Sequence, residues 1–538
     1  MSKRRTFPIL LLALLSVHAS AQDAGVREAD AAEAAADETP FDVWEYRVSG
    51  NTLLPQKEIE RLLYPHLGPG GGMTEVEAAR VALETRYRDS GFPTVLVDLP
   101  EQDVSEGVVR LKVTEGRVDR LRVTGARYYS NGRIRAELPS LAQGTVPHLP
   151  TLQEELARFN QRSADRSVTP VTRAGRTPGT VEFELQVKDR VPLHASLEVN
   201  NRYTLDTEKV RLNASLGYGN LWQRDDSFTM NYQLSPEDVD QVRVLVGTYL
   251  LRPLSSRMVF AFYGVDSNSD VATVGDVNVV GNGQTFGTRA IMPLHHGGAW
   301  SDSVVLGVDY KDFDDTVGFA PEDETDPLRT AIDYFAFSAA YNSTRGGERA
   351  STSWSSGVNF GLRGLGNTRQ EFEDKRFKAR PDYFYLTGGV EHTRALFSSH
   401  WLLFLSGSGQ LSQQPLISNE QFTMGGLNSV RGYLEAEQLA DYGAQARVEL
   451  RTPRLLPKLA RVVDELEAFI FYDWAGAQIL EPLPDQISRF QLASTGVGVR
   501  YVGGKGWQAV FDWAWPLLDG AETQSGDTRV DFSVKYAR

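Results

Sequence analysis

The chain has 538 residues, which is longer than one ordinary soluble domain, so we expect two or three structural units. Its formal net charge of -14 argues against a nucleic-acid partner, because phosphate backbones bind basic surfaces. Cysteine is absent, so no disulfide holds the fold together. Tyrosine, tryptophan and phenylalanine are plentiful, at 20, 9 and 25 residues, and this mixture suits a soluble β-protein and a membrane barrel equally well.

The N-terminus has the pattern of a secretory signal peptide. Basic residues at 3–5 precede the apolar run 7–17, and small residues follow at 19–21. The run is too short for a membrane anchor, which needs roughly 20 apolar residues. We predict a signal peptide over 1–21, then an acidic, alanine-rich tail over 22–40. The tail lacks an apolar stripe, which favours a solvated chain over a helix.

Residues 41–189 contain a pattern that occurs twice. An alternating segment that ends at Val48-Ser49-Gly50 is followed by two helical stretches and two further strands. The same order starts again at Val118, and Val123-Thr124-Gly125 lies 123 − 48 = 75 positions after its first counterpart. We predict two tandem α+β modules, module 1 over 41–117 and module 2 over 118–189.

Each predicted module has a helix that starts like a capping box, with Thr74 and Glu77 in module 1 and Thr151 and Glu154 in module 2. Each module also leaves an open sheet edge, on which an extended peptide can pair. The sequence leaves two roles open for the modules: peptide binding, or packing as spacers only.

From residue 190 to 538, apolar and polar residues alternate with a period of two. The segment 529–536, for example, places Val530 and Phe532 on one face and Asp531 and Ser533 on the other. The segments are longer than the usual soluble strand of about 5–6 residues. Their apolar faces end in aromatic residues, as expected where a barrel wall meets lipid headgroups, and we count roughly sixteen of them. We predict a transmembrane antiparallel β-barrel of about 16 strands with an aqueous lumen. A soluble propeller or sandwich is the alternative.

One connection, 413–442, is far longer than a hairpin turn. By our count it joins the eleventh and twelfth strands, and a loop of this length can fold into the lumen. It contains the stretch GGLNSVRGYLEAE, whose motif residues are Gly425, Gly426, Val430, Arg431, Gly432 and Tyr433. The glycines allow tight backbone where the loop turns back. In a confined lumen Arg431 needs a carboxylate, and its planar fork favours a bidentate one.

Asp473, in the stretch FIFYDWAGAQ on the predicted thirteenth strand, is the candidate partner of Arg431. It faces the lumen if Ile470 and Tyr472 occupy the opposite face of the strand. From the residues alone, the alternative that Arg431 and Asp473 never meet stays open.

The tetrapeptide Val430–Tyr433 in a long loop, followed by Asp473-x-x-Gly476 on a strand, resembles the signature of the bacterial outer-membrane superfamily of POTRA-plus-barrel transporters and assembly proteins. Two POTRA-like modules and a sixteen-stranded barrel further resemble its two-partner secretion branch, the haemolysin and filamentous-haemagglutinin secretion type. The stretches 159–187 and 200–227 are also similar to that branch. The resemblance implies that Arg431 pairs with Asp473 inside the lumen.

The resemblance implies an outer-membrane translocation pore whose POTRA-like modules bind an unfolded exoprotein in the periplasm. Folding of the passenger outside the cell would drive transport without nucleotide hydrolysis. The implied partners are the exoprotein, outer-membrane lipid and the barrel assembly machinery that inserts the pore. One alternative is an insertase for other barrels, which predicts more front modules than two. Another is a passive porin, which needs no repeated periplasmic half.

No enzyme site is indicated. The 8 histidines have no metal-ligand spacing, and no Gly-x-Ser-x-Gly is present. The stretch GPGGGM over 68–73 lacks the lysine of a phosphate-binding loop. We expect no catalytic residues, no metal and no cofactor.

Two features depart from the family pattern. The sequence ends Tyr536-Ala537-Arg538, whereas many family barrels end on an aromatic residue that the assembly machinery reads, so we expect less efficient recognition. Some members have an N-terminal helix that plugs the pore. Here only residues 22–40 precede module 1, and at roughly 3.3–3.6 Å per residue they are too few to fill the lumen and also pass module 1. We expect no full plug.

Overall fold

A computed structural model describes residues 41–538, apart from the internal positions 206, 254–255, 270, 275–276, 281, 295–299, 318–327, 397–400, 456–462, 485 and 505. The predicted signal peptide and tail lie outside the described residues. The chain divides into two compact units. The first contains the described residues up to Gly125 together with Leu138–Phe159 and Val168–Val187, and the second contains Ala126–Glu137, Asn160–Ser167 and Lys188–Arg538.

Module 1 is a three-stranded sheet with helices on it. Its elements are β1 (Glu45–Ser49), α2 (Gln56–Leu63), η1 (Tyr64–His66), α3 (Gly72–Asp89), β2 (Val95–Asp98) and β3 (Val108–Glu115). The strand order is β1-β3-β2, with β1 parallel and β2 antiparallel to β3. The buried side chains Val76, Ala79, Leu83 and Tyr87 recur at helical spacing along α3, and this stripe forms the core with the sheet.

Module 2 repeats this order. Its elements are β4 (Arg117–Thr124), α4 (Asn131–Ala136), η2 (Pro139–Leu141), α5 (Leu149–Gln161), β5 (Arg166–Ala174) and β6 (Thr180–Asp189), and its strand order is β4-β6-β5. Gly50 and Gly125 end the first strands of the two modules with the same φ of 83°. A Cβ at these positions would lie 2.2 Å from the Val113 carbonyl oxygen and 2.4 Å from that of Val187, respectively. The repeated glycine therefore marks one close approach of two strands in both modules.

The two predicted capping boxes are wrong, because both helices begin earlier. Helix α3 starts at Gly72 and α5 at Leu149, so Thr74 and Thr151 lie in the first turns instead of at the caps. The Gly72 amide donates to the Phe41 carbonyl and the Leu149 amide to the Gly91 carbonyl. A tertiary backbone hydrogen bond therefore fixes each helix start ahead of the threonine.

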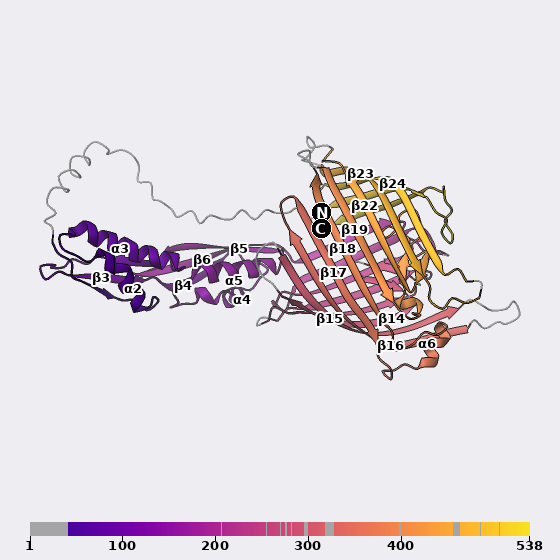
Figure 1. Cartoon of the computed structure of the whole chain (residues 1–538), viewed down its shortest axis with the longest axis horizontal. Coiled ribbons are helices and arrows are strands. Elements are labelled where there is room, and N and C mark those ends of the chain that lie inside the picture. The colour runs from indigo at the N-terminus through magenta and orange to yellow at the C-terminus, as the bar shows by residue number, and fades with distance from the viewer. Residues whose placement is uncertain are drawn as a thin grey trace. The chain divides into compact units, whose positions relative to one another are not determined.

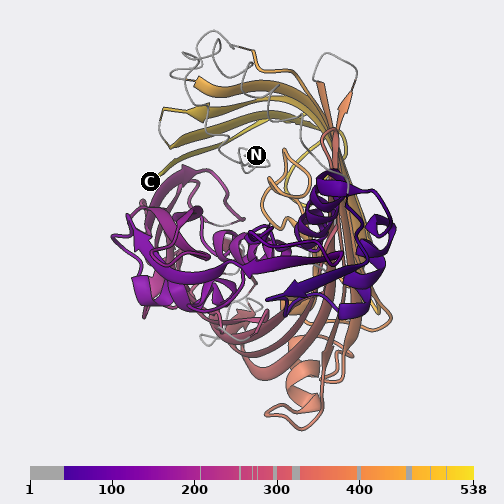
Figure 2. The ribbon, with the colours of Figure 1, turned by 90° about the vertical axis from the view of Figure 1, so that its left-hand side faces the viewer.

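The second unit contains a closed antiparallel barrel of sixteen strands, as predicted. In chain order the strands are β7 (Leu193–Asn200), β8 (Arg211–Leu221), β9 (Asp226–Leu234), β10 (Arg243–Leu251), β11 (Val259–Ser267), β14 (Gly283–Pro293), β15 (Trp300–Val317), β16 (Leu328–Gly346), β17 (Ala350–Gly361), β18 (Phe384–Leu396), β19 (Trp401–Ser412), β22 (Tyr442–Arg451), β23 (Val463–Gln478), β24 (Arg489–Gly503), β25 (Trp507–Pro516) and β26 (Arg529–Ala537). Strand β26 pairs with β7 and closes the barrel. Many of the strands are labelled in Figure 1, and Figure 2 shows them curving around a common interior.

The barrel wall is apolar outside and polar inside, which excludes the propeller and sandwich alternatives. Along β23, Ile470 and Tyr472 are 56% and 46% exposed, whereas Asp473, on the opposite face of the strand, is fully buried. Val497, Phe511 and Val530 continue the exposed apolar face across the next three strands. Lipid contact explains apolar side chains at such exposure. Among the described residues, no helix is long and apolar enough to span a membrane.

Several shorter elements lie between the barrel strands. They are the hairpin β12 (Val271–Val274) and β13 (Val277–Val280), the helix α6 (Arg369–Lys375), the turn η3 (Ser418–Glu420) and the paired strands β20 (Phe422–Met424) and β21 (Gln438–Ala440). The family resemblance implies that the modules lie in the periplasm, and on that placement β7 and every second strand after it end at the extracellular rim. The eleventh strand, β19, is one of these, so residues 413–441 enter from the extracellular side.

Candidate functional site

Residues 413–441 do not form a free loop. Strands β20 and β21 pair antiparallel, so the outgoing and returning chains make a two-stranded ribbon. We call Phe422–Met424 with Gln438–Ala440 the ribbon, and residues 425–437 beyond it the tip. Met424 and Ala440 are fully buried, and they pack with Val430 and Tyr433 of the tip against the lumen face of β23 and β24. Apolar packing therefore holds this segment inside the barrel.

Two glycines set the backbone course of the tip. Gly425 and Gly432 have φ of 99° and 92°, a region that L side chains rarely adopt. A Cβ on Gly425 would lie 2.5 Å from the Leu434 carbonyl oxygen, and one on Gly432 would lie 3.1 Å from the Ala514 side chain. Gly426 also has positive φ. The glycines let the tip turn back and place Arg431 against the wall.

The structure brings Arg431 and Asp473 together. The Arg431 Nε and Nη2 donate to the two carboxylate oxygens of Asp473 at 2.7 and 2.8 Å, and the Arg431 amide donates to one of them at 3.2 Å. Arg431 is 1% exposed and Asp473 is fully buried. This is the bidentate geometry that the guanidinium fork favours, on the thirteenth strand as counted from the sequence.

Four further charged side chains surround this pair, and the sequence analysis missed them. Arg431 Nη1 donates to Glu449 at 2.8 Å and lies 3.7 Å from Asp512. Arg451 Nη2 donates to Glu449 at 2.5 Å, and Arg447 lies 3.5 Å from Glu449. The cluster thus contains three arginines and three carboxylates. Charged residues at 447, 449 and 451 alternate along β22, and such spacing on a barrel strand is a signal for lumen-facing residues.

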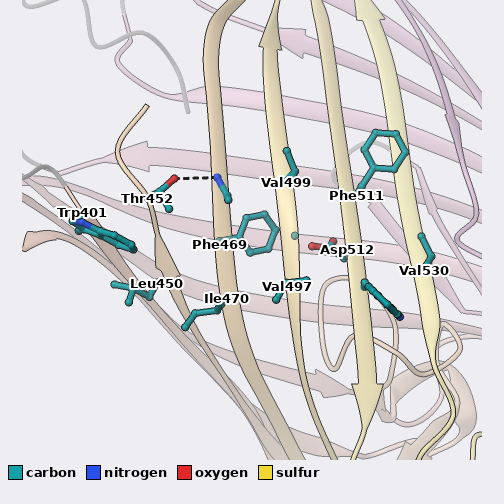
Figure 3. Close-up of a pocket in the computed structure, with 13 residues that line it drawn as sticks. Trp401, Leu450, Thr452, Phe469, Ile470, Val497, Val499, Phe511, Asp512 and Val530 are labelled. Carbon is teal, nitrogen blue, oxygen red and sulfur yellow. Dashed lines mark hydrogen bonds between the residues drawn. The ribbon is translucent and has the colours of Figure 1, made fainter. Parts of the chain in front are cut away.

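Aromatic rings complete the surroundings of Arg431. Its guanidinium carbon lies 3.5 Å from the ring centroid of Phe471, close enough for a cation–π contact. Phe469 and Phe471 lie over Gly498 and Gly496 of the neighbouring strand, where a Cβ would meet the rings at 2.4 and 2.3 Å. Figure 3 shows the Phe469 ring and the Asp512 carboxylate approaching each other beside Val497 and Val499. The glycines of β24 make room for a flat aromatic surface.

Gly496→Ala is expected to destabilise the assembled barrel by about 1–3 kcal/mol, because the new methyl group overpacks the wall. It would lie 2.3 Å from both the Phe471 ring and the Trp513 carbonyl oxygen, and the latter is backbone that cannot rotate away. The readout is the temperature at which the folded band is lost on an unheated gel. Gly388→Ala on β18 is the matched control, because its nearest neighbour would be 3.9 Å away. Equal melting of both variants would contradict the role of Gly496.

The remaining motif residues occupy different places. The Tyr433 hydroxyl is 2.9 Å from the Ala493 carbonyl oxygen and 2.7 Å from that of Leu518, so it fixes the tip to two neighbouring segments. Gly476 lies on the outward face of β23, where the Trp474 ring covers it, and it does not belong to the lumen cluster. The structure therefore separates Gly476 from the other predicted site residues.

The returning end of the tip is bound through two glutamates. Glu435 accepts from Arg202 at 2.8 Å, and Arg202 lies just beyond β7. Glu437 accepts from the amide and hydroxyl of Thr523 at 3.0 and 2.7 Å. These contacts attach the tip to loops next to the β26–β7 closure.

The ribbon is bound at its base by Asp441, which is fully buried. One carboxylate oxygen accepts from the Leu416 amide at 2.8 Å and from the Gln421 side chain at 3.1 Å. The other accepts from Arg376 at 2.8 Å and from the Leu480 amide at 2.6 Å. Four donors from three segments of the chain therefore occupy the acceptor sites of one carboxylate.

Glu420 provides a second anchor at the base. It accepts from Lys311 and Tyr334, each at 2.6 Å, and from Tyr385 at 2.8 Å. These donors lie on three wall strands, β15, β16 and β18. The Gln410 side chain amide reaches the carbonyl oxygens of both Glu420 and Asp441, at 2.9 and 3.3 Å, and so joins the two anchors.

This arrangement holds a lumen segment by buried polar contacts that can be broken without covalent change. Within the described residues, no group of three or more histidines, aspartates and glutamates is placed to hold a metal ion. The chemistry that the site offers is the making and breaking of ion pairs.

An outer-membrane barrel with periplasmic α+β modules and an arginine-bearing lumen segment defines the POTRA-plus-barrel class. The chain belongs to the family described as haemolysin secretion/activation protein ShlB/FhaC/HecB, whose family model matches residues 179–501. Residues 41–116 match the POTRA domain of the ShlB type. The family inferred from sequence is therefore confirmed.

Curated relatives match parts of the chain. The outer membrane transporter CdiB of Escherichia coli O6:K15:H31 (strain 536 / UPEC) is 29% identical over 184 residues, 34% of this chain and 30% of that protein. The CdiB of Dickeya dadantii (strain 3937) is 24% identical over 182 residues, so the aligned part of this chain spans only 32% of that transporter. The heme/hemopexin transporter protein HuxB of Haemophilus influenzae (strain ATCC 51907 / DSM 11121 / KW20 / Rd) is 20% identical over 466 residues, 83% of this chain and 78% of that protein.

Solved structures agree in fold. CdiB from Escherichia coli matches with a TM-score of 0.63 at 19% identity, covering 97% of this chain and 93% of that chain. BamA from Haemophilus ducreyi lacking POTRA domains 1-3 matches with a TM-score of 0.56 at 14% identity, covering 93% and 100%. At these identities the likeness shows a shared fold alone.

Proposed function

We propose that this protein is a translocation pore that secretes an unfolded exoprotein across the outer membrane. The observation that carries the proposal is the tip inside the barrel, held by the buried pair Arg431–Asp473. A lumen segment that is packed and ion-paired keeps the pore closed, and its contacts are reversible. Such a segment is suited to act as a gate, and the family is one of secretion transporters.

The front modules would bind the passenger in the periplasm by strand addition. Strand β2 is at the edge of its sheet and pairs only with β3 in the described part of the chain, so its other side offers unpaired backbone groups. Leu96 on this strand is 53% exposed and supplies an apolar contact for a passenger side chain. An extended peptide added at β2 would gain main-chain hydrogen bonds with little sequence demand. In module 2, β5 has the same edge position.

Transport would draw on folding of the passenger outside the cell. The proposal assigns no catalytic residue, nucleotide or cofactor to the protein. Its further partners would be outer-membrane lipid around the exposed apolar wall and the barrel assembly machinery that would insert the pore.

Deletion of the gene is expected to remove one large exoprotein from the culture medium and to leave the outer-membrane proteome nearly unchanged. Proteomics of both fractions measures this, with complementation by the wild-type chain as the control. A fall of many barrel proteins in the outer membrane with little change in the medium would contradict the proposal and favour an insertase.

A further inference from the structure

The lumen cluster contains a second arginine directed at Asp473. Arg447 stands directly opposite Asp473 in the pairing of β22 with β23. Its Nε lies 3.7 Å from the Asp473 Oδ1, just beyond hydrogen-bonding distance. This Nε is buried, and it has no hydrogen-bond partner among the residues that the structure describes. A buried donor without an acceptor is uncommon in proteins and needs an explanation.

The neighbouring Arg431 explains the distance. Its Nε and Nη2 donate to the two oxygens of Asp473, and its positive charge repels the Arg447 guanidinium, which stays 3.7 Å from the carboxylate. Arg447 also lies 3.5 Å from the Glu449 oxygen to which Arg431 Nη1 donates at 2.8 Å. At both carboxylates, Arg447 therefore lies farther from the oxygens than Arg431 does.

Removal of one partner from a buried ion pair usually leaves an uncompensated charge, which makes separation costly. Here two arginines of the barrel wall, Arg447 and Arg451, stay beside the carboxylates when Arg431 leaves. If Arg431 left, Arg447 would need to move by less than about 1 Å to reach hydrogen-bonding distance from Asp473. Glu449 would retain Arg451, which already donates to it at 2.5 Å. Two arginines and two carboxylates would remain paired on the wall.

We propose that Arg447 is the standby partner of Asp473, and that the tip is released by exchange of Arg431 for Arg447 at this carboxylate. Arg447 is thus a positioning residue for the gate, and this inference rests on the proposed function. The exchange makes opening reversible, because the vacated carboxylate neither stays unpaired nor forms a new contact with the passenger. At the base of the ribbon, Asp441 and Glu420 each have one cationic donor among the described residues, Arg376 and Lys311 respectively, so the base stays in place.

The exchange predicts the direction in which a substitution of Arg447 changes the rate of tip opening. In the closed state Arg447 repels Arg431, and in the open state it compensates the charge of Asp473. Arg447→Gln removes both effects, so it stabilises the closed state, destabilises the open state and is expected to slow opening about tenfold. A residue that only supports the closed tip would have the opposite effect, since its loss would speed opening.

Opening can be measured without any exoprotein, so failure here is separable from failure of the proposed function. Ser429 in the tip is 7% exposed, and the chain contains no cysteine. In a Ser429→Cys background, a bulky maleimide labels the thiol of the purified protein only when the tip opens. We expect the labelling rate to rise with Arg431→Ala, to fall about tenfold with Arg447→Gln and to recover in part with Arg447→Lys.

Arg289→Gln is the matched control. Arg289 is another lumen arginine, bound to Asp309 on a different part of the wall, and its loss should leave the labelling rate unchanged. An unchanged or faster rate in Arg447→Gln overturns the proposal. If that variant does not reach the membrane, Arg447→Lys alone decides, because the missing fork should still slow labelling, and an unchanged rate would overturn the inference.

The double variant Arg431→Ala with Arg447→Gln gives an independent readout. Asp473 then has neither arginine, so the loss of heat stability should exceed the summed losses of the single variants. Additive losses would show that Arg447 does not replace Arg431 and would overturn the exchange.

Discussion

Arg431→Ala is expected to abolish secretion of the exoprotein while the barrel still assembles in the outer membrane. The variant removes the two charge-assisted hydrogen bonds to Asp473 and the one to Glu449, so the tip loses its position in the lumen. Breaking a buried pair in this way costs about 3–5 kcal/mol, towards the lower end here because Arg447 and Arg451 remain beside the carboxylates. Secretion is measured as exoprotein in the medium, and assembly as the folded band of the barrel on an unheated gel.

A second consequence follows from the same loss. A tip that is no longer fixed leaves the lumen open for part of the time, so Arg431→Ala should raise the ion conductance of the purified barrel in planar bilayers. Arg202→Ala is the comparison, since Arg202 binds Glu435 of the same tip and leaves the Asp473 pair intact. Normal secretion together with normal conductance in Arg431→Ala would remove the gate from our proposal.

Asp441→Ala is expected to have the larger effect on assembly. It leaves the Leu416 and Leu480 amides and the Gln421 side chain without their acceptor at a fully buried position, and Arg376 keeps only the Leu480 carbonyl oxygen. We expect a loss of about 3–5 kcal/mol, enough to deplete the folded barrel and to lower its melting temperature on gels. Secretion should fall in proportion to the folded barrel, because the ribbon is bound at its base through this carboxylate.

Asp382→Ala provides the control for a carboxylate in the α6 connection. Its partner Arg363 has a side chain that is 63% exposed, and an exposed pair of this kind contributes less than about 1 kcal/mol. A similar loss of folded barrel in both variants would mean that the four donors around Asp441 do not explain its importance.

Much of the architecture was predictable from local pattern. Alternation with period two predicted the barrel. A strand puts successive side chains on opposite faces, and the face that contacts lipid must be apolar. The Val-x-Gly repeat at Gly50 and Gly125 indicated the two modules, since each glycine lies against the equivalent strand of its own module, β3 or β6. The capping boxes failed because a side chain three residues from a glutamate does not reveal that a distant carbonyl already satisfies the helix start.

The candidate site was predictable only in part. The sequence indicated Arg431 as a charged residue between glycines in a loop far longer than a hairpin turn. Asp473 was indicated by the alternation of side chains along its strand and by the family resemblance. Phe471 over Gly496 and the second arginine at Asp473 could not be predicted, because they depend on which residues face each other across three strands.

By itself, the sequence determined the class of protein: an exported chain with two front modules, a sixteen-stranded barrel and a loop with one arginine that needs a carboxylate. These properties follow from periodicity, spacing and charge, which are local. Only the tertiary structure decided that Asp473 is shared by Arg431 and Arg447, and that Asp441 and Glu420 hold the base of the loop. Strand register and burial set those contacts. Both depend on side chains far apart in the chain meeting in a confined space, where an unpaired charge is costly.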